Sequence, residues 1–486
     1  MDKSATILSY AVRPRVILHV GALALLALTP LPLVPAIIAA LDGDWAFALR
    51  CAAILAVFLA IGVFGRSSRP SAPRLNEALT VMAAAFIVPP LAMGWAMAAY
   101  DIPLNAALFE AVSGLTTTGL SVLPNPEDLD TTLLFTRAWM QWVGGLGFAV
   151  LVLGLMGGAG ASAAQRLNEA EPMGDDPMAP LRTRARRTLM VYAVLTFACF
   201  LALWLTGPDA GRALLFAMTA LATGGFAPHS ASAAVLEGWL PKVILIGFST
   251  LGAISFSVYL HALRGKTLGA GLRTNLLSLF IFAAISVAGL SLFMGLAGFD
   301  VGQVLAHAPF IAVSAQTNTG FSTMEVSALP PAGLAFLMIA MWIGGNSGST
   351  AGGIKTFRVM ILFAMVRLTL QRTSLPPDAV SHLSAAGRRV TGAQLQNVIT
   401  IALLSIATIF LGWIPFLLAG YGPEALFDIT SAVTTTGLST GVVGPTLEPG
   451  LKAVLTVAMI LGRVEFIALL VMIWPPTWIG GAPKDS

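Results

Sequence analysis

Four short phrases rich in threonine and glycine recur along the chain, and their oxygen atoms could together coordinate a cation. They read SGLTTTGL at 113–120, TALATGGF at 219–226, SAQTNTGF at 314–321 and SAVTTTGL at 431–438. Backbone carbonyls from four strands around one axis can replace the water shell of a potassium ion. The last glycine suits this task because it reaches backbone angles that a Cβ makes costly. The expected potassium-binding filter comprises Thr116, Thr117, Thr118, Gly119, Ala222, Thr223, Gly224, Gly225, Thr317, Asn318, Thr319, Gly320, Thr434, Thr435, Thr436 and Gly437.

Threonine and glycine also serve close packing between membrane helices, which would explain a single phrase. The four phrases, however, occur in the same sequence context. Each follows a segment of about a dozen residues, which is too short to cross a bilayer, and each is followed by Leu or Phe. Because non-helical backbone at membrane depth must be buried or line water, we favour four re-entrant segments around a pore.

The composition is that of an integral membrane protein. Of 486 residues, 57% are hydrophobic and only 10% are charged, which is too little charge to cover a soluble protein of this size. Apolar runs of the roughly 20 residues needed for a membrane crossing are clear at 16–41, 46–64, 275–298 and 396–419. No Asp/Glu pair, HExxH or nucleophile motif lies at membrane depth, so an intramembrane enzyme is disfavoured.

The elements that must position the phrases form four blocks after an N-terminal pair of helices, 16–41 and 46–64. Each block has a long outer helix, a short re-entrant pore helix and a long inner helix, which predicts an all-α polytopic membrane protein with four tandem repeats in pseudo-fourfold arrangement and about ten transmembrane helices. The predicted helices are 75–99, 104–115 and 134–157; 188–206, 211–221 and 240–263; 275–298, 304–316 and 333–370; and 396–419, 423–433 and 452–475. The corresponding divisions of the chain are 1–70, 71–160, 161–265, 266–372 and 373–486.

Basic residues gather on one side of this topology. With ten crossings and a cytoplasmic N-terminus, the cytoplasmic stretches hold 21 of the 27 Lys and Arg residues, as the positive-inside rule requires. These stretches are 1–15, 65–74, 158–187, 264–274, 355–395 and 476–486. We therefore expect both termini inside and all four phrases on the external side. Since the cytoplasmic stretches lack a nucleotide-binding fingerprint, any nucleotide-sensing module must be another chain.

A glycine-rich interruption of the third inner helix could serve as a gate, because its residues break a helix and allow it to move. A static kink is the alternative. The predicted gate comprises Gly344, Gly345, Asn346, Ser347, Gly348, Ser349, Thr350, Ala351, Gly352 and Gly353, together with Arg463. An intramembrane Arg is costly unless it is paired or faces water; we expect Arg463 to face the pore cavity, with a structural bridge to an acid as the alternative. Lys355 and Arg358 are expected to be anchors at the membrane surface.

Two acids occupy equivalent places, because Glu110 and Asp428 each lie nine residues before the last glycine of a phrase. They could hold the filter backbone by hydrogen bonds or concentrate cations near the mouth, and we favour the first role. Cys51 and Cys199 fall inside predicted spans and are expected to be packing residues. The histidines show no paired metal-ligand spacing, which disfavours a metal centre.

The phrases and three further motifs resemble the membrane subunits of Trk-type potassium uptake systems, whose superfamily includes the Ktr and HKT transporters. The motifs are WVGGLGF at 142–148, WIGGNSGSTAGGIKTFRV at 342–359 and LGRVE at 461–465, and the resemblance extends over about 70–475. It implies a homodimer in the bacterial inner (plasma) membrane, a TrkA-like cytoplasmic nucleotide-binding regulatory subunit, K⁺ as transported ion, no covalent cofactor and no nucleic-acid partner. It also implies that glycine in all four filter positions, Gly119 included, goes with potassium preference.

The expected function is therefore gated potassium uptake through a carbonyl-lined filter, without enzymatic chemistry. Two phrases depart from Thr-Thr-Thr, at Ala222-Thr223-Gly224 and Thr317-Asn318-Thr319, so the fourfold symmetry is expected to be imperfect. Symport of potassium with protons or sodium is the alternative function. Coupling of that kind needs buried titratable groups, and the spans offer few acids beyond Glu110, Asp428 and Glu465.

Overall fold

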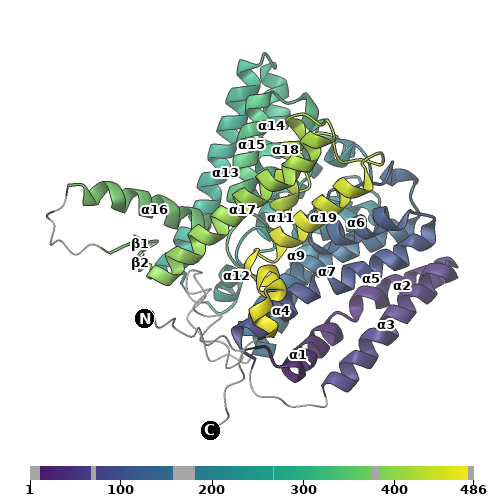
Figure 1. Cartoon of the computed structure of the whole chain (residues 1–486). Coiled ribbons are helices and arrows are strands. Elements are labelled where there is room, and N and C mark those ends of the chain that lie inside the picture. Colours follow the sequence, from purple (N-terminus) through teal and green to yellow (C-terminus); the bar gives the residue numbers. More distant parts are fainter. Residues whose placement is uncertain are drawn as a thin grey trace, which may run out of the picture.

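The chain is helical almost throughout, and its helices pack into one body. The computed structural model describes residues 11–66, 73–156, 181–265, 267–374, 376 and 382–479. Figure 1 shows the helices side by side, with α16 (Thr356–Arg372) extending from the body as an arm. Within the described residues, strands occur only as the antiparallel pair β1 (Ser384–Ala385) and β2 (Arg388–Arg389), next to α16. The predicted all-α class is confirmed.

Four repeats of outer, pore and inner helix follow one another, as predicted. The outer helices are α4 (Leu75–Ala85) with α5 (Val88–Met97), α9 (Leu181–Trp204), α13 (Ala270–Leu296) and α17 (Gly392–Leu418). The pore helices are α6 (Leu104–Leu115), α10 (Ala210–Leu221), α14 (Val301–Gln316) and α18 (Glu424–Val433). The inner helices are α7 (Thr131–Met156), α11 (Leu240–Gly252) with α12 (Phe256–Ala262), α15 (Pro331–Ile343) with α16, and α19 (Pro449–Arg463) with α20 (Ile467–Ile473). Short helices are η1 (Ala98–Tyr100), η2 (Pro126–Asp128), η3 (Ser232–Val235), η4 (Val326–Ala328) and α21 (Pro475–Trp478).

The N-terminal pair packs against itself and against the first repeat. The predicted helix 16–41 is divided into α1 (Pro14–Ala27) and α2 (Pro30–Asp42), because Pro30 cannot donate a backbone hydrogen bond to the preceding turn. Both pack along α3 (Trp45–Gly65). The Asp44 side chain begins α3 by accepting a hydrogen bond from the Phe47 N–H at 3.2 Å.

Two inner helices that were predicted as continuous, 240–263 and 452–475, are instead sharply bent. The bend is 89° between α11 and α12 and 112° between α19 and α20. At the first bend, the freed carbonyls of Gly252 and Ala253 accept hydrogen bonds from Thr350 N at 3.2 Å and Asn346 N at 3.0 Å. The 344–353 loop therefore supplies the partners that buried broken backbone requires, and the sequence of the helix alone does not reveal this.

The apolar core joins the repeats to one another. One buried cluster links repeats two and three and contains Phe216, Phe321 and Cys199. A second cluster links the N-terminal helices to the first repeat and contains Cys51. Both cysteines are free and buried, which confirms the predicted packing role.

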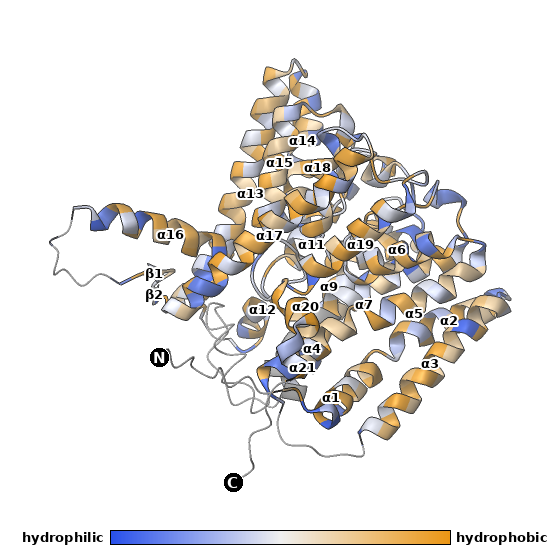
Figure 2. Ribbon diagram, in the orientation of Figure 1, coloured by the Kyte–Doolittle hydropathy of each residue, from blue (hydrophilic) through white to orange (hydrophobic). Residues whose placement is uncertain are grey.

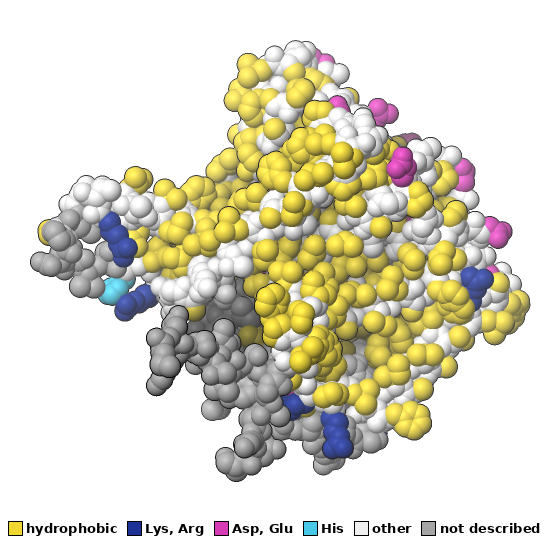
Figure 3. Space-filling view, in the orientation of Figure 1, with side chains coloured by type: hydrophobic (Ala, Val, Ile, Leu, Met, Phe, Trp, Pro, Cys, Tyr) yellow, Lys and Arg dark blue, Asp and Glu magenta, His cyan; other side chains and the backbone are white. Residues whose placement is uncertain are grey.

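The outer surface is apolar across the middle of the body. Six helical segments of the described residues are long and apolar enough to cross a membrane, and the two bent pairs raise this number to eight. With α7 and the interrupted segment of α15 and α16, the arrangement accommodates the ten predicted crossings. Orange residues dominate the ribbons of these helices in Figure 2. In the face shown in Figure 3, acidic side chains gather along the upper right edge, whereas most basic side chains lie toward the lower left.

Candidate functional site

Each pore helix ends in the same unusual turn. In each of the stretches 116–119, 222–225, 317–320 and 434–437, the second residue has a left-handed backbone with φ between +50° and +55°, and the final glycine has φ between +74° and +91°. The third residue's N–H donates to the carbonyl five residues earlier at 2.8 to 2.9 Å, which terminates the helix. The left-handed residues are Thr117, Thr223, Asn318 and Thr435. A residue with a Cβ in this conformation costs about 1–2 kcal/mol, so the same strain occurs at four equivalent places.

We call 116–119, 222–225, 317–320 and 434–437 the filter segments, and their glycines form a closed ring. A Cβ added to any of these glycines would overlap a carbonyl oxygen of the next segment. The overlapping pairs are Gly119 with Gly224 O, Gly225 with Thr319 O, Gly320 with Thr436 O and Gly437 with Thr118 O. Because each segment contacts the next and the fourth contacts the first, the four surround one axis in chain order.

The side chains of the filter segments are nearly, but not fully, fourfold. In three segments the first and third threonine hydroxyls lie 2.8 Å apart, in the pairs Thr116 with Thr118, Thr317 with Thr319 and Thr434 with Thr436. The second segment has Ala222 and Gly224 in these places, so the expected asymmetry is present. Among the described residues, no partner accepts or donates a hydrogen bond at Thr117 Oγ1, Asn318 Oδ1 or Thr435 Oγ1, although all three side chains are buried.

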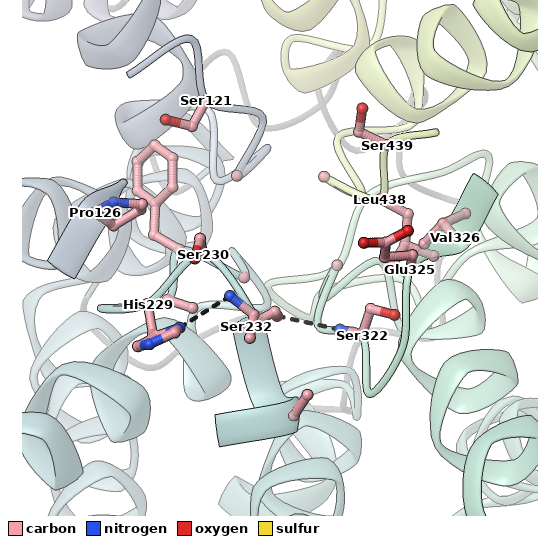
Figure 4. A pocket seen from close by; sticks show the side chains of 18 of the residues that line it. Ser121, Pro126, His229, Ser230, Ser232, Ser322, Glu325, Val326, Leu438 and Ser439 are labelled. Carbon is pink, nitrogen blue, oxygen red and sulfur yellow. Dashed lines mark hydrogen bonds between the residues drawn. The ribbon is translucent and has the colours of Figure 1, made fainter. Parts of the chain in front are cut away.

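A cavity of about 820 Å³ opens onto the ring, and all four filter glycines line it. Figure 4 shows Ser121, His229, Glu325 and Ser439 around it, from loops that follow the four segments. At its rim, Ser230 donates to Glu127 from both its N–H at 2.8 Å and its hydroxyl at 2.7 Å. Desolvation raises the pKa of Glu127, but these hydrogen bonds and nearby His229 outweigh it and leave the pKa below its ordinary value. Glu127 therefore stays ionised near neutral pH.

Two fully buried carboxylates fasten the chain just after the first and fourth segments. Glu110 accepts from Val122 N at 2.7 Å and forms an ion pair with Arg137 at 3.0 Å. Asp428 accepts from Ser439 Oγ at 2.6 Å, and also from the Thr440 and Val443 backbone at 2.8 and 3.1 Å. As predicted, both acids hold backbone by hydrogen bonds. Repeats two and three have Phe216 and Ile311 at the equivalent positions, where apolar contact replaces the carboxylate.

We expect Asp428→Asn to weaken the fourth filter loop. An amide offers one acceptor oxygen where the carboxylate offers two, and its NH₂ group faces donors, so the free energy of unfolding should fall by about 1–3 kcal/mol. The measurement is the thermal unfolding midpoint of the purified protein in detergent. Glu424→Gln on the same helix, where the residue is exposed, is the matched control and should stay within about 0.5 kcal/mol of wild type. Equal midpoints for Asp428→Asn and wild type would contradict this role.

The 344–353 loop lies against the inner end of the filter segments. Gly353 N donates to the carbonyl of Thr434 at 3.1 Å, and the Thr223 hydroxyl donates to Thr350 Oγ1 at 3.2 Å. A third contact is made by Gln316, just before the third segment, whose amide donates to Gly344 O at 2.7 Å. The loop therefore touches residues of three repeats.

Arg463 lies beside this loop and is 3% exposed. Its guanidinium donates to Thr350 O at 2.9 Å and to Gly144 O at 3.0 Å, so it ties the loop to the first inner helix. Glu465 forms its ion pair with Arg358, at 2.6 Å. This bridge joins the third and fourth repeats and was not predicted, because the predicted alternative was a bridge from Arg463 to an acid.

The expectation that Lys355 and Arg358 are anchors at the membrane surface is wrong. Their exposed fractions are 3% and 4%. The chain turns back into the body after the loop: Lys355 has φ +84°, and its N–H donates to Ile343 O at 2.9 Å. The Lys355 ammonium donates to Ala351 O, so both basic groups belong to the interior around the loop.

Two buried glutamines that contact the site, Gln141 and Gln316, were not predicted. Gln141 on α7 donates to Gly224 O at 2.6 Å and accepts from Phe226 N at 3.1 Å. Gln316 accepts from the Ser286 hydroxyl at 2.9 Å while it holds the loop. The available signal was an uncharged amide within an otherwise apolar stretch, which must find hydrogen-bond partners when buried.

The fold and site together define an all-helical, multi-pass membrane protein in which four re-entrant segments surround one axis. The profile of the TrkH family, described as cation transport protein, matches residues 90–475. The chain belongs to this family.

Curated relatives and a solved structure agree with that assignment. The chain is 31% identical over 388 residues to the Trk system potassium uptake protein TrkH of Halomonas elongata, covering 76% of this chain and 79% of that one. It is 29% identical to the Trk system potassium uptake protein TrkG of Escherichia coli, covering 78% and 80%. The crystal structure of the potassium transporter TrkH from Vibrio parahaemolyticus has the same fold, with TM-score 0.81, 23% identity and coverage of 96% and 99%.

Proposed function

We propose that this protein takes up potassium through a gated selectivity filter formed by residues 116–119, 222–225, 317–320 and 434–437. The ring of glycines in chain order carries this proposal, because it places backbone oxygens of all four repeats around one axis. Potassium sheds its water at the external cavity and binds carbonyl oxygens along the axis. The unpartnered oxygens of Thr117, Asn318 and Thr435 supply further ligands at the inner end. The pore helices direct their partially negative C-termini at the ion.

The 344–353 loop and Arg463 form the gate in this proposal. The loop lies against the filter segments, and Arg463 holds it while placing a positive charge next to the path. When the loop moves, a cation passes from the filter to the inside. The membrane potential, negative inside, drives entry at about 2.3 kcal/mol per charge per 100 mV. No covalent chemistry and no resident cofactor are needed.

The setting that we propose is the bacterial inner membrane, with both termini cytoplasmic. The separation of acidic and basic side chains in Figure 3 supports this orientation. Parts of the predicted cytoplasmic stretches, including 158–180 and 480–486, lie outside the described residues. We further propose a homodimer regulated by a TrkA-like nucleotide-binding subunit, as the resemblance to Trk-type systems implies; the relatives are named as proteins of a Trk system. The proposed divisions remain 1–70, 71–160, 161–265, 266–372 and 373–486.

Electrical recording from the purified protein in a planar bilayer tests this function. With potassium and sodium gradients opposed, the current should reverse near the potassium equilibrium potential. A reversal potential that moves with pH or with sodium would instead support symport, the second candidate. Absence of any potassium current or flux, with the regulatory subunit present as well as absent, would contradict both.

A further inference from the structure

The second filter segment lacks the hydroxyl pair that braces the other three. In those segments, a hydrogen bond between the first and third threonine side chains links the helix end to the extended backbone that follows it. The second segment has Ala222 and Gly224 instead, followed directly by Gly225. Two consecutive glycines have more backbone freedom than any other pair. Something else must fix this segment if its carbonyl is to keep its place in the ring.

Gln141 occupies the space that a third threonine would need. A Cβ at Gly224 would overlap the amide group of Gln141, so a side chain at 224 and Gln141 exclude each other. The amide donates to Gly224 O at 2.6 Å and accepts from Phe226 N at 3.1 Å. These two hydrogen bonds lie on either side of Gly225 and fix the peptides that flank it.

The second and fourth inner helices do not repeat this arrangement. Gly144, Gly252 and Gly462 each pack against the last carbonyl of the pore helix in their own repeat, so they mark equivalent positions. Three residues earlier stand Gln141, Ser249 and Met459. The buried Ser249 hydroxyl donates within its own helix, to Leu245 O at 2.9 Å. Gln141 is thus matched to the one segment that lacks threonine at its first and third places.

We propose that Gln141 is a positioning residue that sets cation selectivity by fixing the second filter segment in place of the missing hydroxyl pair. The inference rests on the proposed potassium filter and deepens it. A carbonyl held by a side-chain amide keeps one orientation, and selectivity between potassium and sodium depends on the number and placement of such oxygens. Without Gln141, the two peptides that flank Gly225 can rotate, and the second of the four filter segments is no longer held rigidly.

The test measures the potassium-to-sodium permeability ratio, from reversal potentials of the full-length protein in bilayers. Gln141→Met keeps the volume but removes both hydrogen bonds, and its ratio should fall by at least about fivefold, which corresponds to the net contribution of a single hydrogen bond. Ser249→Ala is the matched control and should keep the wild-type ratio. A wild-type protein without potassium preference would overturn the proposed function itself. A selective wild type with an equally selective Gln141→Met would overturn only the role of Gln141.

A rescue experiment separates positioning from general stability. Gln141→Ala vacates the space at Gly224, and adding Ala222→Thr with Gly224→Thr restores the Thr-Thr-Thr-Gly pattern of the first and fourth segments. The triple variant should regain a permeability ratio within about twofold of wild type, whereas Gln141→Ala alone should not. If Gln141→Met does not fold, the comparison of the triple variant with Gln141→Ala decides instead. Equal loss of selectivity in the single and triple variants would overturn the proposal that Gln141 replaces the hydroxyl pair.

Discussion

Gly119→Ser should reduce the discrimination between potassium and sodium by at least about tenfold, which corresponds to about 1.4 kcal/mol. Gly119 has φ +88°, and a Cβ there would overlap the Gly224 carbonyl oxygen. The serine side chain must therefore displace an oxygen of the neighbouring segment, and it introduces a hydroxyl that can serve as a new ligand. The ring then no longer presents four equivalent groups to the ion. Permeability ratios from reversal potentials measure the change.

The effect of backbone strain at position 119 must be separated from the effect of the overlap with the Gly224 carbonyl. Gly43, between α2 and α3, has φ +81° and nothing within 4 Å of an added Cβ. Gly43→Ser therefore carries a similar conformational penalty without contact to the filter, and it should leave selectivity unchanged. If Gly119→Ser also kept the wild-type permeability ratio, the assignment of Gly119 to the potassium filter would be wrong.

The pore helices were predictable because their limits are encoded locally. Each is a short apolar segment that ends directly before its filter segment, and α6 (Leu104–Leu115) has the predicted bounds. The third, α14 (Val301–Gln316), begins three residues earlier than predicted, where Asp300 caps it by accepting from Gln303 N at 3.0 Å. A capping box at 300–303 was present in the sequence and gives that boundary.

The bends and the buried ion pair were not predictable because their partners lie far away in sequence. The break after Gly252 is stabilised by backbone groups of the 344–353 loop, and hydropathy alone favours a continuous helix there. Buried Arg358 pairs with Glu465, which belongs to another repeat and lies 2.6 Å away. Gln141 poses the same problem, since its proposed role depends on the absence of hydroxyl side chains at 222 and 224.

Contacts between the loop and the filter segments imply that the proposed gate and the proposed filter are not independent. Gly353 N donates to the carbonyl of Thr434, and the Asn318 amide donates both to Met341 O and to Thr436 Oγ1, at 2.8 Å each. Movement of the loop would therefore remove a hydrogen bond from a filter segment. The loop begins directly after α15, which ends at Ile343. Asn318 therefore connects the third filter segment both to the end of α15, through Met341 O, and to the fourth filter segment, through Thr436 Oγ1.

Arg463→Gln should raise potassium flux through the protein, measured without a regulatory subunit, by at least about tenfold. In the proposed gate, Arg463 places a positive charge beside the path, and its guanidinium holds Thr350 O and Gly144 O. A barrier of about 2 kcal/mol, the energy of two like unit charges about 8 Å apart at an effective dielectric constant of 20, would account for more than a tenfold change. Glutamine also releases one of the two carbonyls, which favours movement of the loop.

Arg463→Lys is the matched variant, because it keeps the positive charge but not the two hydrogen bonds that the guanidinium donates to Thr350 O and Gly144 O. If the charge forms the barrier, flux through Arg463→Lys stays near wild type while flux through Arg463→Gln rises. If the tie to the loop forms the barrier, both variants conduct more. Unchanged flux in both, with thermal unfolding midpoints like wild type, would show that Arg463 is a packing residue and that the gate lies elsewhere. Flux of ⁸⁶Rb⁺ into liposomes that contain the full-length protein distinguishes these outcomes. Both variants leave the filter residues unchanged, so a change in flux reports a change in the barrier at the proposed gate.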